Sequence, residues 1–180
     1  IRAEAEIMVE HLLGMTPTQL VANLQQPFPE THSERLEMIL ARRLCREPLR
    51  YIVGECPFYG RVFAVTPDVL IPREETELLV DRALLHLSRT RRPGPARIAD
   101  VGTGSGIIAI TVALEAADVP DGSTIEVHAV DVSPGALGIA KRNAIKVAPH
   151  ANLSFHEGDL LSPLEGRFDV IIVPHQAVRQ

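Results

Sequence analysis

The sequence predicts an α/β fold, in which a parallel sheet follows a small helical domain. The main observation is that apolar, β-branched runs alternate with helical patterns between residues 98 and 173. A glycine-rich turn directly after the first of these runs is the second observation, and a helical periodicity over the first 54 residues is the third. Strands that alternate with helices form parallel sheets with right-handed crossovers.

The composition is that of a globular protein. The chain has 180 residues, 46% of them hydrophobic, and a formal net charge of −5. The negative charge argues against broad nonspecific binding to nucleic acid, and no apolar run is long enough to cross a bilayer. Cys45 and Cys56 lack CxxC spacing, which favours a reducing compartment such as the cytoplasm. No two of the seven histidines have metal-ligand spacing, so we expect no metal site.

Residues 1–54 follow a helical pattern. Apolar residues recur at three- and four-residue steps, as in the run of Ala5, Met8, Val9, Leu12 and Leu13. Thr16 and Gln19 fit a capping box with Pro17 at the first helical position, and residues 33–45 form a second amphipathic stretch. We therefore expect a helical N-terminal domain.

Four arginines gather near the end of this domain, namely Arg42, Arg43, Arg46 and Arg50. They form either a solvated helix face or a contact with an acidic protein or RNA partner. Residues 58–65 then predict a β-hairpin around Gly60, inside a linker that we place at residues 55–70.

Residues 71–180 predict the α/β domain. A helix over residues 74–87 comes first, and Glu residues in its first turn favour the positive end of the helix dipole. The expected strands span residues 98–101, 125–130, 153–156 and 168–173, and the helices between them span residues 107–115 and 136–147.

The turn after the first strand carries a cofactor-binding pattern. Asp100 ends the strand, and glycines follow at 102, 104 and 106. Glycines allow backbone N–H groups to approach a ligand, and the turn would lie at the carboxyl end of a strand and the start of a helix. A dinucleotide fingerprint requires glycine where Ile107 stands. The pattern instead resembles the S-adenosylmethionine loop of Rossmann-like methyltransferases, which implies cofactor contacts from Gly102, Thr103, Gly104, Ser105 and Gly106. A tight turn without a ligand is the alternative.

Two further acids follow later strands. Asp131 ends the second strand, where this class of fold hydrogen-bonds ribose hydroxyls, although a capping role is also open. Asp159 and Leu160 follow the third strand. In related methyltransferases an aspartate at this place meets the adenine amino group and its apolar neighbour packs on the ring. A solvated turn is the alternative for Asp159.

Several motifs together resemble one family. They occur in the family's order and read Tyr51-Ile-Val-Gly54, Phe58-Tyr59-Gly60, Leu70-Ile-Pro-Arg-Glu-Glu-Thr-Glu77, Asp100-Val-Gly-Thr-Gly-Ser-Gly106, Ala129-Val-Asp131, Arg142-Asn143-Ala144 and Phe168-Asp-Val-Ile-Ile172. The chain resembles the HemK-type protein-(glutamine-N5) methyltransferases. The resemblance implies a helical domain that recognises release factors, a hairpin linker, and a Rossmann-like class I methyltransferase sheet. It also implies S-adenosylmethionine as cofactor, the glutamine of a Gly-Gly-Gln motif in a peptide chain release factor as substrate, and a cofactor pocket bordered by the segment around Arg73.

The chain departs from the family after residue 172. The family continues with an Asn-Pro-Pro-Tyr loop that holds the substrate amide, whereas this chain reads Val173, Pro174, His175 and Gln176. Pro174 has no side-chain acceptor at the place of the family's Asn, and the catalytic residues are therefore left unassigned. His175 or Gln176 offers a chemical substitute. We expect a domain truncated at its C-terminal end, through a truncated or frameshifted product, a deleted loop or a divergent paralogue.

Three functions follow from this pattern. The first is S-adenosylmethionine-dependent methylation of a release factor in translation termination, with no membrane or direct nucleic-acid partner. The second is a catalytically inactive protein or fragment that retains cofactor binding. The third is methylation of an amino group on DNA or RNA, against which the acidic charge argues.

Overall fold

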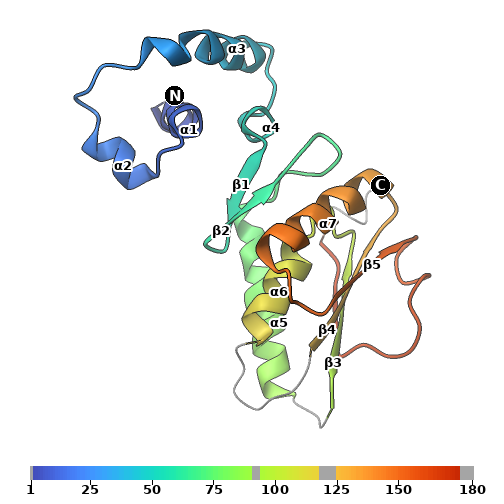
Figure 1. Cartoon of the computed structure of the whole chain (residues 1–180). Helices are drawn as coiled ribbons and strands as arrows, with labels where there is room; N and C mark the ends of the chain where they lie inside the picture. The colour runs from blue at the N-terminus through green and yellow to red at the C-terminus, as the bar shows by residue number, and fades with distance from the viewer. Residues whose placement is uncertain (1, 91–93, 118–124, 175–180) are drawn as a thin grey trace. The chain divides into compact units, whose positions relative to one another are not determined.

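The computed structural model describes residues 2–90, 94–117 and 125–174 and divides the chain into two compact units, Ile1–Gly54 and Glu55–Gln180 (Figure 1). The hairpin that we predicted as a linker is part of the second unit. No helix among the described residues is long and apolar enough to span a membrane.

The first unit is helical. It contains α1 (Arg2–Leu13), α2 (Pro17–Ala22), a 3-10 turn η1 (Glu30–His32), α3 (Ser33–Leu44) and α4 (Leu49–Val53). Its core brings together apolar side chains from three of these helices, namely Met8, Leu12, Ile39, Leu49 and Ile52. Thr16 caps α2 as the sequence indicates: its Oγ1 accepts from the N–H of Gln19, whose Oε1 accepts from the N–H of Thr16 at 2.9 Å.

Two arginines of the basic cluster are engaged inside this unit. Arg43 donates to the Glu4 carboxylate of α1 at 2.8 Å, and Arg42 donates to Glu47 at 2.8 Å through Nε. These contacts favour a structural role for both side chains over a partner contact.

The second unit begins with an antiparallel hairpin of β1 (Glu55–Phe58) and β2 (Arg61–Ala64). Tyr59 and Gly60 form its two-residue turn with φ of 49° and 72°. Positive φ at both positions is the type I′ geometry that suits the twist of a hairpin. The turn is attached to the following helix, because the Tyr59 N–H donates to Glu77 Oε1 at 2.6 Å and its hydroxyl donates to Asp81 at 2.8 Å.

The rest of the unit is a parallel sheet with helices. A 3-10 turn η2 (Glu74–Thr76) precedes α5 (Glu77–Arg89), so the helix expected from Glu74 has a tighter first turn. The following elements are β3 (Ala96–Val101), α6 (Ile107–Ala117), β4 (Ile125–Asp131), α7 (Pro134–Val147), β5 (Leu153–Glu157) and β6 (Val170–Ile172). The strands lie in the order β5-β4-β3-β6 and all pairs are parallel. The predicted α/β fold is confirmed.

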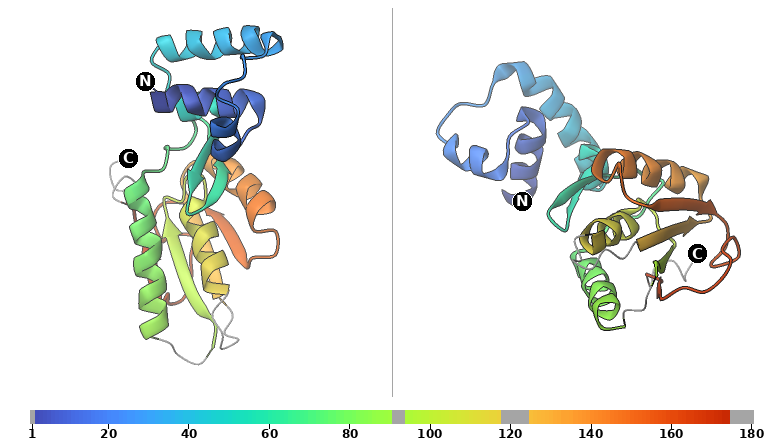
Figure 2. Two further views of the ribbon diagram at one scale, coloured as in Figure 1. Left: turned by 90° about the vertical axis from the view of Figure 1, so that its left-hand side faces the viewer. Right: turned by 60° about the horizontal axis from the view of Figure 1, so that its bottom comes forward.

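Helices α5, α6 and α7 lie side by side on one face of this sheet, with α6 in the middle (Figures 1 and 2). Helix α6 reads Ile-Ile-Ala-Ile-Thr-Val-Ala-Leu-Glu-Ala-Ala, and a helix that is apolar on nearly all sides is suited to such a central position. Ile98, Ile110 and Val127 are fully enclosed in the core between the helices and the strands.

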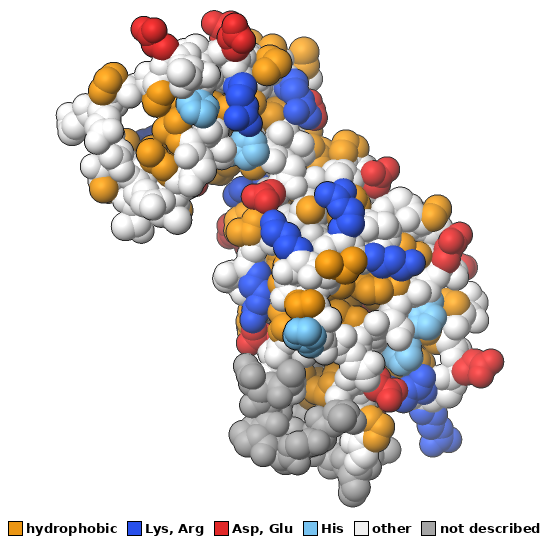
Figure 3. All heavy atoms as spheres, in the orientation of Figure 1, with side chains coloured by type: hydrophobic (Ala, Val, Ile, Leu, Met, Phe, Trp, Pro, Cys, Tyr) orange, Lys and Arg blue, Asp and Glu red, His pale blue; other side chains and the backbone are white. Residues whose placement is uncertain are grey.

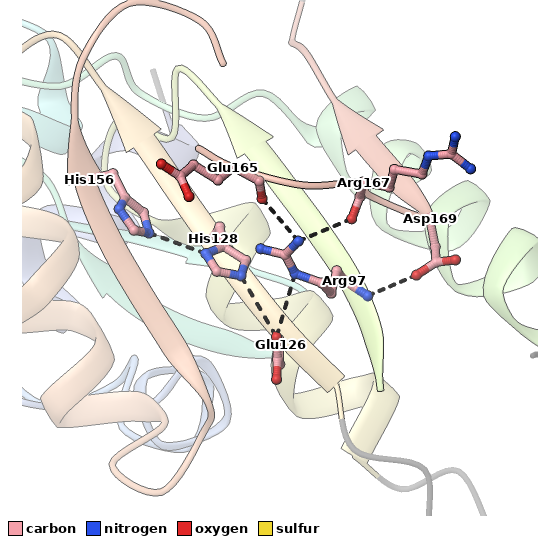
Figure 4. Close-up of polar contacts among 7 residues, drawn as sticks. All are labelled: Arg97, Glu126, His128, His156, Glu165, Arg167 and Asp169. Atoms are coloured by element: carbon pink, nitrogen blue, oxygen red, sulfur yellow. Dashed lines mark hydrogen bonds and ion pairs between the residues drawn. The ribbon is translucent and has the colours of Figure 1, made fainter. Parts of the chain in front are cut away.

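A polar cluster on the sheet holds the segment between β5 and β6 in place (Figure 4). Arg97 donates through Nη1 to the carbonyls of Glu165 at 3.0 Å and Arg167 at 3.2 Å, and its guanidinium lies over the Phe168 ring. Glu126 lies 3.6 Å from Arg97 Nε. These contacts hold residues 165–168, in the later part of the same segment that begins with Gly158, Asp159 and Leu160.

Candidate functional site

A cavity of about 250 Å³ lies at the carboxyl ends of β3, β4 and β5, where open α/β sheets bind ligands. The stretches of chain that line it include the glycine loop after β3 and the segment of residues 68–76 that follows the hairpin. The residues that line it are Asp68, Val69, Leu70, Pro72, Thr76, Val101, Gly102, Thr103, Gly104, Ser105, Ile107, Ile108, Asp131, Val132, Ser133, Ala136, Gly158, Asp159, Leu160 and Pro174.

The backbone of the glycine loop needs its glycines. Gly102, Gly104 and Gly106 have φ of 71°, 55° and 77°, a region that side chains with a Cβ rarely adopt. Gly102 and Gly104 line the cavity together with Thr103 and Ser105, whereas Gly106 does not.

Gly106 has a packing role instead. A Cβ added there would lie 2.9 Å from the Ala140 Cβ of α7 and 3.1 Å from the Ala140 Cα. The glycine therefore lets α6 begin directly against α7. Sequence reasoning placed all three glycines at the ligand, because the spacing of glycines does not distinguish a ligand contact from a helix contact.

Four of the five N–H groups of residues 102–106 are already used within the protein, which differs from our expectation that they would face a ligand. Gly102 and Thr103 both donate to the carbonyl of Val130, at 2.8 and 2.9 Å. Gly104 donates to Asp131 Oδ2 at 2.8 Å, and Gly106 donates to the Thr103 carbonyl at 2.9 Å. A loop with most of its donors satisfied internally is a poor phosphate cradle, because such cradles present several N–H groups to the anion.

The Asp131 carboxylate accepts hydrogen bonds from two segments of the site. It is largely buried, and its Oδ1 accepts from the N–H of Ser133 at 3.0 Å while its Oδ2 accepts from Gly104. Each carboxylate oxygen has two lone pairs, so both oxygens retain acceptor capacity for a ligand hydroxyl. The capping role that we left open for Asp131 therefore does not compete with a ligand role.

Asp100 lies beneath the loop and is fully buried. Its Oδ2 accepts from Thr103 Oγ1 at 2.7 Å and from the N–H of Ala109 at 3.2 Å, and no donor among the described residues reaches its Oδ1. Burial is the main reason that the pKa of Asp100 rises to about 6, with the nearby Asp131 charge adding to the rise against the two hydrogen bonds.

Asp159 and Leu160, in the turn after β5, also line the cavity. The N–H of Gly158 donates to the Asp131 carbonyl at 3.1 Å, which fixes the start of this turn beside the end of β4. Leu160 has φ of 49° and remains half-exposed, so its side chain is available to a ligand. The structure thus brings Asp131, Asp159 and Leu160 together around one cavity.

Residues 68–76 include several cavity-lining residues that the sequence motifs did not identify individually. Leu70, Pro72 and Thr76 line the cavity, and Arg73 between them is exposed and does not. Asp68 also lines it, with its Oδ2 accepting from Thr66 Oγ1 at 3.0 Å. The ionisable side chains that line the cavity within the described ranges are all acidic: Asp68, Asp131 and Asp159.

Pro174 lines the same cavity, so the position where the resemblance expects Asn lies at the site. Its side chain has no hydrogen-bonding group, and its backbone carbonyl is the acceptor that it offers. The candidate substitutes His175 and Gln176 lie outside the described residues. Of the described residues, no group of three or more His, Cys, Asp or Glu side chains is placed to hold a metal ion.

Comparison with protein families agrees with this architecture. Residues 76–174 match the methyltransferase small domain. The chain belongs to this methyltransferase family. Residues 1–54 match the PrmC N-terminal domain, so the two matches fall on either side of the hairpin. The resemblance that the motifs indicate is confirmed.

Curated relatives are similar to most of this chain. The chain is 38% identical over 171 residues to a release factor glutamine methyltransferase of Bordetella pertussis, and the alignment covers 95% of this chain and 60% of the relative. It is 41% identical over 160 residues to a release factor glutamine methyltransferase of Bacillus subtilis, covering 88% of this chain and 53% of the relative. The chain thus spans little more than half the length of these relatives.

Proposed function

We propose that the cavity binds S-adenosylmethionine and that the chain acts as a methyltransferase on a release-factor glutamine. The observation that carries the cofactor proposal is the charge of the site. Its lining ionisable groups are acidic, and most of the loop's N–H groups are engaged internally. S-adenosylmethionine has a positive sulfonium and a positive ammonium and no phosphate, which suits such a site, whereas the pyrophosphate of a dinucleotide does not.

Different lining residues would contact different parts of the cofactor. Asp131 would accept hydrogen bonds from the ribose hydroxyls, Asp159 would accept from the adenine amino group, and Leu160 would cover the ring. Gly102, Thr103, Gly104 and Ser105 would border the methionine portion, with Gly106 acting indirectly through the packing of α6 on α7. These roles agree with the positions of the residues around one cavity.

The proposed reaction is an in-line displacement. A bond forms between the glutamine amide nitrogen and the methyl carbon as the carbon–sulfur bond breaks, the electron pair stays on sulfur, and the nitrogen releases a proton to solvent. An amide nitrogen is a weak nucleophile because its lone pair is delocalised, so catalysis depends on acceptors that hold the N–H groups in line. Pro174 lines the cavity and would offer its backbone carbonyl to one N–H group, but it has no side-chain acceptor.

Pro174 also motivates a second candidate, which is a protein that binds the cofactor without efficient transfer. Losing even about 3 kcal/mol of positioning would slow turnover by roughly a hundredfold. The relatives' names and the match of residues 1–54 support a release factor as partner, in which case the protein would work in the cytoplasm.

The nucleic-acid alternative receives less support. On the face that Figure 3 shows, Lys and Arg side chains are interspersed with Asp and Glu side chains rather than gathered into one basic surface. Proteins that bind nucleic-acid backbones present a basic stripe or patch.

Calorimetry tests the cofactor proposal. We expect S-adenosylmethionine to bind the full chain and NAD not to bind under the same conditions; comparable binding of both ligands would contradict the charge argument. A methyl-transfer assay with labelled cofactor and an intact release factor, run beside the Bacillus subtilis relative, tests the reaction. Turnover more than about a hundredfold below the relative supports the second candidate, and turnover within about tenfold supports transfer.

A further inference from the structure

Asn143 joins two segments of chain that lead into the lining of the cavity. It lies on α7 with its side chain 1% exposed, and it makes three side-chain hydrogen bonds. Its Oδ1 accepts from the N–H of Ala64 at 2.8 Å, and its Nδ2 donates to the Ala64 carbonyl at 3.0 Å and to the Ser105 carbonyl at 2.8 Å. The amide therefore uses an acceptor and both of its donors on two separate segments.

Both of these segments lead into the lining of the cavity. Ser105 belongs to the glycine loop. Ala64 ends β2, and the chain continues from it into residues 68–76, several of which also line the cavity. Asn143 bonds both the N–H and the C=O of Ala64, as a neighbouring strand would, and so sets the position of β2 relative to the loop. The contact between Gly106 and Ala140, one helical turn earlier on α7, holds the end of the same loop against the same helix.

We propose that Asn143 is a positioning residue that sets the distance between the glycine loop and residues 68–76, and thereby the width of the cofactor cavity. The expected effect on cofactor affinity rests on the proposed function, whereas the restraint of the loop exists without ligand. Neither an aspartate nor a leucine reproduces it, because an ionised carboxylate lacks both donors and leucine lacks every hydrogen-bonding group.

The variants Asn143→Ala and Asn143→Leu test the restraint. The leucine variant retains most of the side-chain volume and so separates the loss of hydrogen bonds from the opening of a cavity. Val80→Ala is the matched control, because Val80 is fully buried in the core on α5 and does not line the cavity. Three quantities are measured for each protein: the thermal midpoint, the amide exchange of residues 61–66 and 102–106 without ligand, and the Kd for S-adenosylmethionine.

We expect both Asn143 variants to exchange at least tenfold faster in both segments and to bind the cofactor at least tenfold more weakly. Val80→Ala, at a similar loss of thermal midpoint, should change the Kd less than twofold. Exchange of residues 102–106 within twofold of the wild type in Asn143→Leu would overturn the inference, as would equal loss of affinity in Val80→Ala. If the wild-type chain binds no S-adenosylmethionine, the proposed function fails, and the exchange measurement still decides the role of Asn143.

Discussion

The N–H of Gly104 donates to Asp131 Oδ2 over 2.8 Å, and this bond connects the loop after β3 to the end of β4. The same carboxylate receives the N–H of Ser133 at the start of α7. Asp131 therefore holds three elements together at the place where we propose that it binds the ribose. A substitution there removes a ligand contact and loosens the loop that borders the cofactor.

Asp131→Ala should weaken cofactor binding by roughly 5- to 150-fold, because hydrogen bonds to a charged group contribute about 1–3 kcal/mol. Asp159→Ala is the comparison, since Asp159 lines the same cavity and its side chain is exposed. Calorimetry should show a loss of affinity in both variants. Amide exchange of residues 102–106 without ligand should accelerate only in Asp131→Ala. An unchanged Kd in Asp131→Ala would contradict the ribose assignment.

Gly106→Ala should destabilise the protein more than Gly104→Ala does. Both glycines have positive φ, so both substitutions incur backbone strain of about 1 kcal/mol. Only the new Cβ at Gly106 meets Ala140, whereas nothing lies within 4 Å of one at Gly104. Overpacking of this kind costs a further ~1–3 kcal/mol. Urea unfolding of the two variants measures the difference between their free energies of unfolding. Equal destabilisation would show that the start of α6 can move away from Ala140 without cost.

This pair of glycines illustrates what the sequence could and could not predict. The order of strands and helices follows from apolar periodicity, which is a local signal, and the structure confirms it. The acids after successive strands also predict one site, because parallel strands end at the same edge. Which glycine faces the cavity and which faces Ala140 depends on how α6 packs against α7, and neither helix carries that information alone.

Asn143 is a second residue whose role could not be predicted from the sequence. Its sequence neighbours place it on a helix, and an asparagine in that position is ordinarily a surface residue. Its role arises from Ala64 and Ser105, which lie 79 and 38 residues away in the chain. The three hydrogen bonds become visible only when the hairpin is placed beside the glycine loop.

Ionisation of Asp100 should lower the free energy of unfolding as the pH rises from about 4 to about 6. The pKa of this carboxyl is about 6 in the folded protein against 3.8 for an ordinary aspartate, so the folded state binds the proton more tightly. Its contribution is fully favourable below pH 3.8 and is lost as the pH passes through 6. A shift of this size corresponds to about 3 kcal/mol.

Urea unfolding of the wild type and of Asp100→Asn across this pH range measures that contribution. Other carboxylates also titrate there, so the informative quantity is the difference between the two proteins. The wild type should lose stability relative to Asp100→Asn as the pH rises. Parallel stability curves would show that Asp100 ionises normally, and hence that water reaches its Oδ1.

Arg97→Met should release the segment between β5 and β6. It removes the hydrogen bonds to the carbonyls of Glu165 and Arg167 and the contact with Phe168, at a cost of about 1–3 kcal/mol for the bonds to a charged donor. Arg167→Met is a matched control, because it removes one positive charge from the same segment while its side chain points away from the cluster (Figure 4).

Amide exchange of residues 158–169 should accelerate in Arg97→Met and stay near the wild-type rate in Arg167→Met. Because Asp159 and Leu160 belong to this segment, Arg97→Met should also weaken cofactor binding although Arg97 does not line the cavity. The weakening should be smaller than in Asp159→Ala, since the carboxylate itself remains and only its position is less restrained. Accelerated exchange with an unchanged Kd would mean that Asp159 and Leu160 contribute little to the bound cofactor, which would leave Asp131 and the glycine loop as the main determinants of affinity.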